Sequence, residues 1–248
     1  MPVQEVYRNE AHRAATGGVE KRAYVRRIFS EIAPRYDLLN HLLSLNVDRV
    51  WRRRAIRALA WEQAPDGTYV DLCAGTLDVG AELARRPGFA GVVIGADFAE
   101  PMLRAGEGKA PRAVLAPVVA DALALPIADG SAAGVVVAFG VRNLTDLDAG
   151  LREAWRVLEP GARFVILEFS TPRAPLVRAL YHFYFRRILP LVGRAVSGHA
   201  TAYRYLPESV ANFPDREHLA SRMERAGFRN VQWRALSFGI AALHWGER

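Results

Sequence analysis

The chain has 248 residues, 51% of them hydrophobic, which is enough to fold into one large α/β domain or two small ones. Its single cysteine, Cys73, excludes an intramolecular disulfide and a cysteine-based zinc site and favours a reducing cytosol. The six histidines lack metal-ligand spacing, so we expect no metal. No apolar run approaches the roughly 20 residues that span a bilayer, and we expect no signal peptide.

The net charge of +7 is unevenly distributed. Residues 1–60 carry twelve Lys or Arg against six acids, and residues 169–207 carry six Arg and no acid, so these segments hold +6 each and leave −5 for the rest. Two basic segments on a mildly acidic core are typical of proteins that bind an anionic membrane surface or nucleic acid. Ordinary solvated helix faces would give the same pattern, and charge alone does not choose among the three interpretations.

The N-terminal quarter is expected to be helical after a loose start. Residues 1–17 are polar, charged and without apolar periodicity, which predicts a flexible arm. Residues 18–64 place apolar side chains at helical spacing between arginines, and Pro34 interrupts the first helix. We expect this segment to form a helical lid that ends at a turn over 65–67 (PDG).

From residue 68 the pattern changes to short apolar runs that alternate with helical stretches. Each run is almost continuously apolar, as in strands buried on both faces, so we predict an α/β fold with a mostly parallel, seven-stranded sheet between helices, in a single domain over 18–248. The first five strands are expected at 68–72, 91–96, 114–120, 134–139 and 163–169, and helices at 78–85, 99–107 and 146–158.

This rhythm breaks at residues 172–206, which are predicted to form a helical insertion. Within it, residues 173–194 are rich in arginine and aromatic residues and predict one long helix. The chain then returns to a helix over 215–226 and two strands over 228–235 and 239–244. We expect these two strands to form an antiparallel hairpin at one edge of the sheet.

The turn after the first predicted strand, 71–78 (DLCAGTLD), is the expected cofactor site, because ligands of open α/β sheets bind outside the carboxyl ends of the strands. Small residues at 73–75 let a ligand approach the backbone, and Gly75 can adopt a positive φ. A dinucleotide fingerprint is absent, and the acids Asp71 and Asp78 would repel a pyrophosphate but attract an ammonium or a sulfonium. The alternative is a tight strand-to-helix turn that Asp78 caps.

Acids also end the next two strands. Asp97 follows the second strand, where a carboxylate can accept both hydroxyls of a ribose. Asp121 follows the third strand beside the small Ala122, where an adenine ring could be held. A single acid at the end of a strand is often only a cap for the next helix or turn. Acids at the ends of three successive strands indicate a ligand site instead.

The chain resembles the class I methyltransferases and, within them, the quinone-biosynthesis C-methyltransferases that act on demethylmenaquinol and on the ubiquinol precursor. The similarity runs from about residue 25 to 246, and it is carried by 29–37 (FSEIAPRYD), 139–146 (FGVRNLTD), 156–161 (RVLEPG), 167–170 (LEFS) and 239–244 (GIAALH). The resemblance implies a Rossmann-like class I methyltransferase fold, S-adenosylmethionine as cofactor, and methylation of a ring carbon of a prenylated benzoquinol or naphthoquinol.

The resemblance also implies cofactor contacts at Thr76, Asp97, Asp121 and Ala122. The sequence departs from the family pattern at Leu77, within a turn that is usually glycine-rich, and at Ala138, where a serine is usual. Together with the strand-end acids, the predicted cofactor-binding residues are Asp71, Gly75, Thr76, Asp78, Asp97, Phe98, Asp121, Ala122 and Ala138.

A hydroquinol ring carbon becomes nucleophilic when a phenolic hydroxyl loses its proton, so the site needs help with deprotonation, a charge that stabilises the oxyanion, and alignment, but no metal. Arg142 follows the fourth strand and is predicted to stabilise the phenolate, and Asn143 to orient a hydroxyl or a water. Tyr36 and Asp37 are predicted to close over the ring, with Asp37 as proton acceptor. The alternatives are a surface pair between Arg142 and Asp146 and an N-cap role for Asp37.

Residues 173–194 combine basic and aromatic side chains without an acid, which favours peripheral contact with an anionic membrane and entry of a prenyl tail. The side chains concerned are Arg178, Tyr181, Phe183, Tyr184, Phe185, Arg186, Arg187 and Arg194. An ordinary amphipathic surface helix or a dimer helix is the alternative. We expect a cytoplasmic protein, peripheral on the inner face of the cell membrane, that takes a membrane-embedded prenylated quinol, with a homodimer left open.

Three other functions fit parts of the sequence. A class I methyltransferase for another small aromatic acceptor would have the same cofactor site. A basic nucleic-acid-binding module would explain the sequence pI of about 10.0, but no such motif is present and the strand-end acids would repel phosphates, so we expect no nucleic-acid partner. A dehydrogenase is disfavoured because its glycines are missing.

Overall fold

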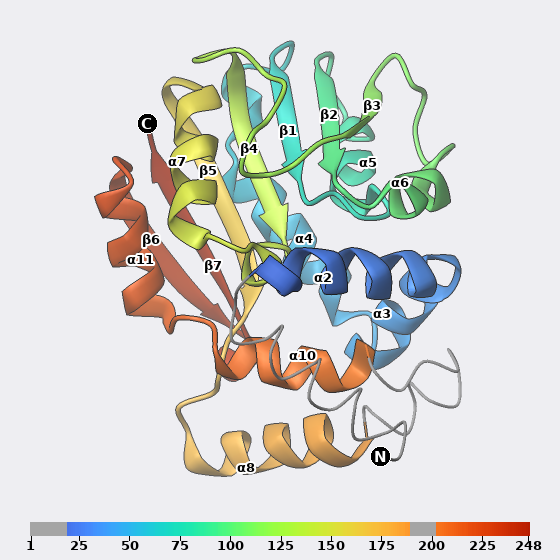
Figure 1. Ribbon diagram of the computed structural model, residues 1–248. Coiled ribbons are helices and arrows are strands. Elements are labelled where there is room, and N and C mark those ends of the chain that lie inside the picture. The colour runs from blue at the N-terminus through green and yellow to red at the C-terminus, as the bar shows by residue number, and fades with distance from the viewer. Residues whose placement is uncertain (1–18, 189–201) are drawn as a thin grey trace.

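The computed structural model describes residues 19–188 and 202–248, and its centre is a seven-stranded sheet (Figure 1). The strand order is β3-β2-β1-β4-β5-β7-β6; β1 to β5 are parallel, β7 is antiparallel to β5, and β6 is antiparallel to β7. This confirms the predicted α/β fold with its antiparallel edge pair. The strands are β1 (Thr68–Leu72), β2 (Val92–Asp97), β3 (Leu115–Val119), β4 (Ala132–Ala138), β5 (Leu158–Phe169), β6 (Arg229–Leu236) and β7 (Ala241–Glu247).

The central strands are apolar because helices cover both of their faces. Successive residues of a strand point to opposite faces, so Val135 and Val137 of β4 pack in one core cluster and Val136 packs in the other. Phe164 and Val165 of β5 are divided in the same way. Because helices bury both faces of these strands, these apolar residues follow one another without the polar alternation of a half-exposed strand.

Strand β5 is longer than predicted. We expected it over 163–169, but it begins at Leu158, which pairs with Ala132 ahead of a register shift in β4. Pro160 and Gly161 are residues typical of turns, so the apolar pattern of a strand begins only after them. Gly161 does adopt a positive φ of 83°, yet the fully buried Leu158 holds the preceding backbone in the sheet.

Two layers of helices enclose the sheet (Figure 1). One face carries α4 (Val47–Ala58), α5 (Asp78–Ala84) and α6 (Glu100–Gly106), and the other carries α7 (Leu147–Val157) and α11 (Arg216–Arg225). The short η2 (Trp61–Gln63) joins α4 to β1, η3 (Val141–Asn143) follows β4, and η5 (Ser237–Gly239) joins β6 to β7.

A third group of helices lies at the end of the sheet where the parallel strands finish (Figure 1). It contains α2 (Val19–Ile32), η1 (Ala33–Arg35) and α3 (Tyr36–Ser44) from the predicted lid. The α-helix α2 ends two residues before Pro34, and Pro34 lies within η1, which follows it. The predicted interruption of the first helix at this proline is therefore confirmed. The arm predicted for residues 1–17 lies outside the described residues.

The predicted insertion contributes α8 (Pro175–Phe183), the π-helical η4 (Tyr184–Ile188) and α10 (Ala202–Ala211). The single helix predicted for 173–194 therefore begins at Pro175 and changes to π-helical pairing at Tyr184, and residues 189–194 lie outside the described part of the chain. Among the helices of the described residues, none is long and apolar enough to cross a membrane.

Candidate active site

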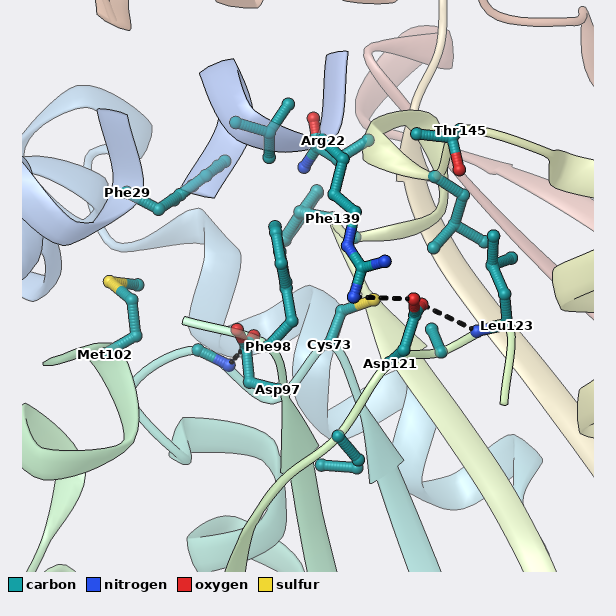
Figure 2. Close-up of a pocket in the computed structure, with 18 of the residues that line it drawn as sticks. Arg22, Phe29, Cys73, Asp97, Phe98, Met102, Asp121, Leu123, Phe139 and Thr145 are labelled. Atoms are coloured by element: carbon teal, nitrogen blue, oxygen red, sulfur yellow. Dashed lines mark hydrogen bonds and ion pairs between the residues drawn. The ribbon is translucent and has the colours of Figure 1, made fainter. Parts of the chain in front are cut away.

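A pocket with an empty volume of about 730 Å³, its open mouth included, lies beneath α2 at the carboxyl ends of β1, β2 and β4 (Figure 2). Of the predicted site residues, it is lined by Tyr36, Gly75, Asp97, Phe98, Asp121, Ala122, Ala138 and Asn143. The lining also includes residues that were not among the predicted site residues: Arg22, Val25 and Phe29 from α2, Met102 from α6, and Phe139 after β4. Phe29 and Phe139 open two of the motifs that carry the resemblance.

The floor of the pocket is the turn between β1 and α5. Cys73, Gly75 and Leu77 all adopt positive φ values, of 53°, 52° and 65°. Such a run in a short turn is strained and is typical of functional loops. A Cβ atom on Gly75 would lie 3.3 Å from Cε of Met102, so the glycine preserves open space at the floor. The backbone of the turn is therefore open at Gly75 even with Leu77 in place of a glycine, and the close approach of a cofactor stays a prediction.

Asp97 holds this turn in place from the end of β2. Its two carboxylate oxygens accept hydrogen bonds from the backbone N–H groups of Gly75 at 2.9 Å and Ala99 at 2.8 Å. Burial raises the pKa of Asp97, and these backbone bonds oppose the shift. The backbone N–H of Phe98 also stabilises the charged carboxylate, and its oxygens line the pocket, where they can accept hydroxyls of a ligand.

Arg22 reaches from α2 to the opposite wall of the pocket (Figure 2). Its guanidinium lies 3.0 Å from Asp121, whose other oxygen accepts the backbone N–H of Leu123 at 3.0 Å. Asp121 is thus an oriented acceptor beside Ala122, and the contact of this pair with an adenine ring stays a prediction. The contact with Arg22 was not predicted, because nothing in the helical pattern of 18–64 distinguishes Arg22 from the other arginines of that segment.

Arg142 lies behind the pocket wall and is absent from the lining. Its guanidinium donates to Glu168 at 2.8 Å and to the carbonyl oxygen of Phe139, and Glu168 is only 1% exposed. The suggested surface pair with Asp146 is wrong, because Asp146 instead caps α7 by accepting the N–H of Ala149 at 2.9 Å. Arg142 therefore belongs to a buried ion pair at the end of β4 and β5.

Asp37 and Asp78 face away from the pocket into a shared ion-pair network. Asp37 accepts the hydroxyl of Thr76 and pairs with Lys109, and Lys109 also donates to Asp78 at 2.6 Å. Burial alone would raise the pKa of Asp78, but Arg52 and Lys109 lower it below its usual range. The cap roles suggested for both acids are wrong: Asp37 lies within α3, and the N-cap of α5 is Leu77, without a side-chain bond.

Asp71 is buried beneath α5, where its carboxylate accepts the backbone N–H of Gly80 at 2.8 Å. Burial raises the pKa of Asp71 from 3.8 to about 8. Asp71, Thr76, Asp78, Asp37 and Arg142 therefore support the pocket from outside its lining.

Replacing Asp71 by asparagine is expected to change the pH dependence of stability. A folded-state pKa above the unfolded value means that the folded protein binds this proton more tightly, so its contribution to stability is lost as the pH rises through about 4 to 8. Asparagine keeps an acceptor for Gly80 but has no proton to lose. We expect the melting temperature of Asp71→Asn, relative to wild type, to rise across this range. The exposed Asp129→Asn is the control, and parallel pH profiles for wild type and Asp71→Asn would contradict the expectation.

Four buried polar atoms near the pocket lack a hydrogen-bond partner within the described residues: Nε of Arg142, Oδ1 of Asn143, and the hydroxyl oxygens of Tyr181 and Tyr205. Tyr181 and Tyr205 belong to an aromatic cluster between α2, α8, η4 and α10, against which Phe29, Tyr36 and Phe98 of the pocket pack. Unsatisfied buried polar atoms are costly, so their accumulation indicates room for a polar ligand. No group of His, Cys, Asp or Glu in the described part of the chain could hold a metal ion.

Known proteins resemble this chain in sequence and in fold. Residues 17–248 match the ubiE/COQ5 methyltransferase family. The demethylmenaquinone methyltransferase of Thermus thermophilus is 50% identical over 89% of this chain and 100% of that protein. The ubiquinone/menaquinone biosynthesis C-methyltransferase UbiE of Geobacter sulfurreducens is 43% identical over 92% of this chain and 90% of that protein. A solved SAM-dependent methyltransferase of Thermotoga maritima shares the fold with a TM-score of 0.63 at 16% identity, over 89% of this chain and 98% of that one.

Proposed function

The chain belongs to the ubiE/COQ5 methyltransferase family, and on this premise we propose that it is an S-adenosylmethionine-dependent C-methyltransferase that acts on a ring carbon of a prenylated quinol. The observation that carries the proposal is the pocket in which Asp97 and the Gly75 turn meet, lined also by Asn143 and backed by Arg142 behind its wall. This arrangement supports a cofactor site with an acceptor site beside it.

The residues of the pocket fit S-adenosylmethionine. Asp97 lines the pocket and can accept ribose hydroxyls, Asp121 and Ala122 offer an acceptor and a small surface for the adenine, and both carboxylates attract a cationic ligand. Gly75 leaves the backbone open at the floor. When bound, the cofactor supplies an activated methyl group and leaves as S-adenosylhomocysteine.

Arg142 is proposed to make the acceptor more acidic through its electric field. Burial raises the pKa of Tyr36, Tyr181 and Tyr205, and the positive charge of Arg142 lowers the pKa of each of these phenols against that effect. For Tyr181 and Tyr205 the carboxylate of Glu168 is a smaller influence that raises the pKa. A quinol hydroxyl among the same three rings would feel the same charge, so its oxyanion would be stabilised while charge moves onto the ring carbon. Asn143 lines the pocket and can orient that hydroxyl.

We assign Asp37 to holding the lid closed rather than to accepting a proton. Its carboxylate is engaged by Thr76 and Lys109, and it links α3 to the turn that forms the floor of the pocket. Tyr36, the neighbouring residue, lines the pocket and lies edge-on to Phe29, with 5.9 Å between the ring centroids. The lid would then exclude water from the methyl-transfer site.

The proposed function is tested by methyl transfer from labelled S-adenosylmethionine, read by product mass. The acceptors are demethylmenaquinol, a prenylated demethyl benzoquinol and a water-soluble phenol, each offered in the reduced state. We expect one methyl group on a ring carbon of a prenylated quinol. Turnover of the soluble phenol alone would replace this acceptor by another small aromatic compound.

We further propose that the protein works in the cytoplasm and contacts the inner face of the membrane peripherally through α8. Leu176, Leu180 and Phe183 are 73%, 61% and 60% exposed and share one face of the helix, as their spacing of four and three residues requires. Tyr181 and Phe185 on the opposite face are buried. A helix that is apolar toward solvent and anchored by aromatics on its inner face suits the interface of a bilayer.

Replacing Leu176 and Leu180 by glutamine is expected to reduce binding to lipid vesicles by about tenfold or more, since each buried leucine contributes roughly 1.5–3 kcal/mol when it leaves water. Co-sedimentation with vesicles measures the effect. The double variant Val92→Gln/Val119→Gln, which changes two exposed apolar residues of β2 and β3, serves as the control. Equal binding by the α8 variant and wild type would make α8 an ordinary surface helix.

A further inference from the structure

A second pocket lies between the end of β5, the start of α8 and the segment that joins α10 to α11. Its empty volume is about 770 Å³ with its mouth included, and it is separate from the pocket described above. Three arginines line it: Arg173, Arg178 and Arg216. We refer to it as the arginine pocket.

Arg216 is the unusual member of the three. It is only 7% exposed, and among the described residues its guanidinium makes no hydrogen bond and no ion pair; it lies over the face of Trp233, at 5.3 Å from the ring centroid. A Cβ atom on Gly239 would lie 3.0 Å from Nη1 of Arg216, so the glycine makes room for the guanidinium itself. None of the guanidinium nitrogens is a fully buried atom without a partner, so the group reaches the open space of the pocket and is accessible to an anion.

The remaining charges of the arginine pocket leave it positive. Arg178 makes no ion pair with any residue in the described ranges, while Arg173 pairs with Glu217. Asp215 also lines the pocket and offsets one of the three positive charges; its Oδ1 accepts the backbone N–H of His218 at 2.9 Å and lies 2.7 Å from Nδ1 of His218. Two guanidinium groups, those of Arg178 and Arg216, are therefore available to one ligand.

We propose that the arginine pocket binds the phosphate group of an anionic phospholipid. Planar guanidinium groups match the oxygens of a phosphate, and two of them on one pocket would hold it in a bidentate manner. Arg178 stands on α8 nearly opposite Leu176, Leu180 and Phe183, so the helix that presents apolar side chains to solvent also lines the phosphate site. The site would fix the depth and orientation of α8 on a bilayer, independently of methyl transfer.

The test compares the full-length chain on vesicles of equal negative surface charge, one set containing phosphatidylglycerol and the other oleate, which has no phosphate. Wild type is expected to bind the phosphatidylglycerol vesicles about tenfold more tightly, because a charge-assisted hydrogen bond to phosphate adds to the general attraction. Arg178→Gln is expected to lose this preference. Arg216→Lys keeps the charge without the planar fork and is expected to lose most of it.

Arg225→Gln is the matched control, because it removes an arginine that makes no ion pair with the described residues from the far end of α11, roughly 13 Å along the helix axis from Arg216 and beyond one Debye length of about 8–10 Å. It should retain the preference for phosphatidylglycerol.

Equal binding of wild type to both vesicle sets, or equal losses in Arg178→Gln and Arg225→Gln, would overturn the proposal in favour of general electrostatics. Calorimetric binding of inorganic phosphate to wild type but not to Arg178→Gln, without a vesicle preference, would replace the lipid by a free phosphate. Cofactor affinity should not change in any variant, which separates this test from that of the proposed function.

Discussion

Replacing Asp97 by alanine is expected to weaken S-adenosylmethionine binding by roughly 10- to 150-fold, the equivalent of about 1.5–3 kcal/mol for hydrogen bonds to a charged group. Asp97 is 8% exposed, and its carboxylate accepts hydrogen bonds from the N–H groups of Gly75 and Ala99. Its remaining acceptor capacity is directed at the pocket and is what the ribose would use. The variant loses both this capacity and the anchor of the Gly75 turn.

Isothermal titration calorimetry with S-adenosylmethionine and S-adenosylhomocysteine measures the loss, and thermal unfolding of the free variant reports any damage to the turn. Asp129→Ala is the control, because Asp129 is an exposed acid that pairs with Arg156 outside the pocket. Both ligands should weaken equally in Asp97→Ala, since the ribose is common to them. An affinity equal to that of wild type would remove Asp97 from the cofactor site.

The sheet and the strand-end acids could be predicted from the sequence because both follow from local rules. Strands that are buried on both faces must be apolar throughout, and Val135 to Val137 obey that rule. The carboxyl ends of parallel strands lie at one edge of the sheet, so acids that end β2 and β3 were expected to meet, and Asp97 and Asp121 do line one pocket.

The supporting groups could not be assigned in this way, because their roles depend on partners that are distant in sequence. Asp37 and Asp78 resembled helix caps until Lys109 was placed between them. Arg142 had a charge of opposite sign four residues away at Asp146, but it pairs with Glu168 on the neighbouring strand. Spacing along a helix predicts only local contacts, whereas a buried guanidinium requires the partner that the packed core provides.

The hydroxyls of Tyr181 and Tyr205 were missed for a related reason. Both residues occupy helical positions that are typical of core aromatics, and nothing in the spacing reveals that their hydroxyl oxygens are buried without a partner. Only the packing of α8 and α10 over the pocket end of the sheet makes them candidates for contact with an acceptor.

Replacing Arg142 by methionine is expected to have two separable effects. It leaves Glu168 buried without a cation, which should lower the free energy of unfolding by about 3–5 kcal/mol. It also removes the charge that lowers the pKa of the surrounding phenols, which should lower kcat by about 10²-fold, the scale for losing one group that stabilises an oxyanion. Cofactor affinity should change little, because Arg142 does not line the pocket.

The double variant Arg142→Met/Glu168→Gln distinguishes the two effects, because glutamine carries no charge to leave unpaired and can still accept the backbone N–H of Phe169 that Glu168 accepts at 2.8 Å. We expect it to recover most of the melting temperature and none of the turnover on the reduced quinone. Arg152→Met, an exposed arginine on α7, is the control for both measurements. Arg142→Lys should recover only part of the rate, since a lysine ammonium keeps the charge but ends one atom short of Nη1, the nitrogen that donates to both Glu168 and the carbonyl of Phe139. A stable double variant with near-normal kcat would make Arg142 purely structural and leave Tyr36 and Asn143 as the groups that act on the acceptor.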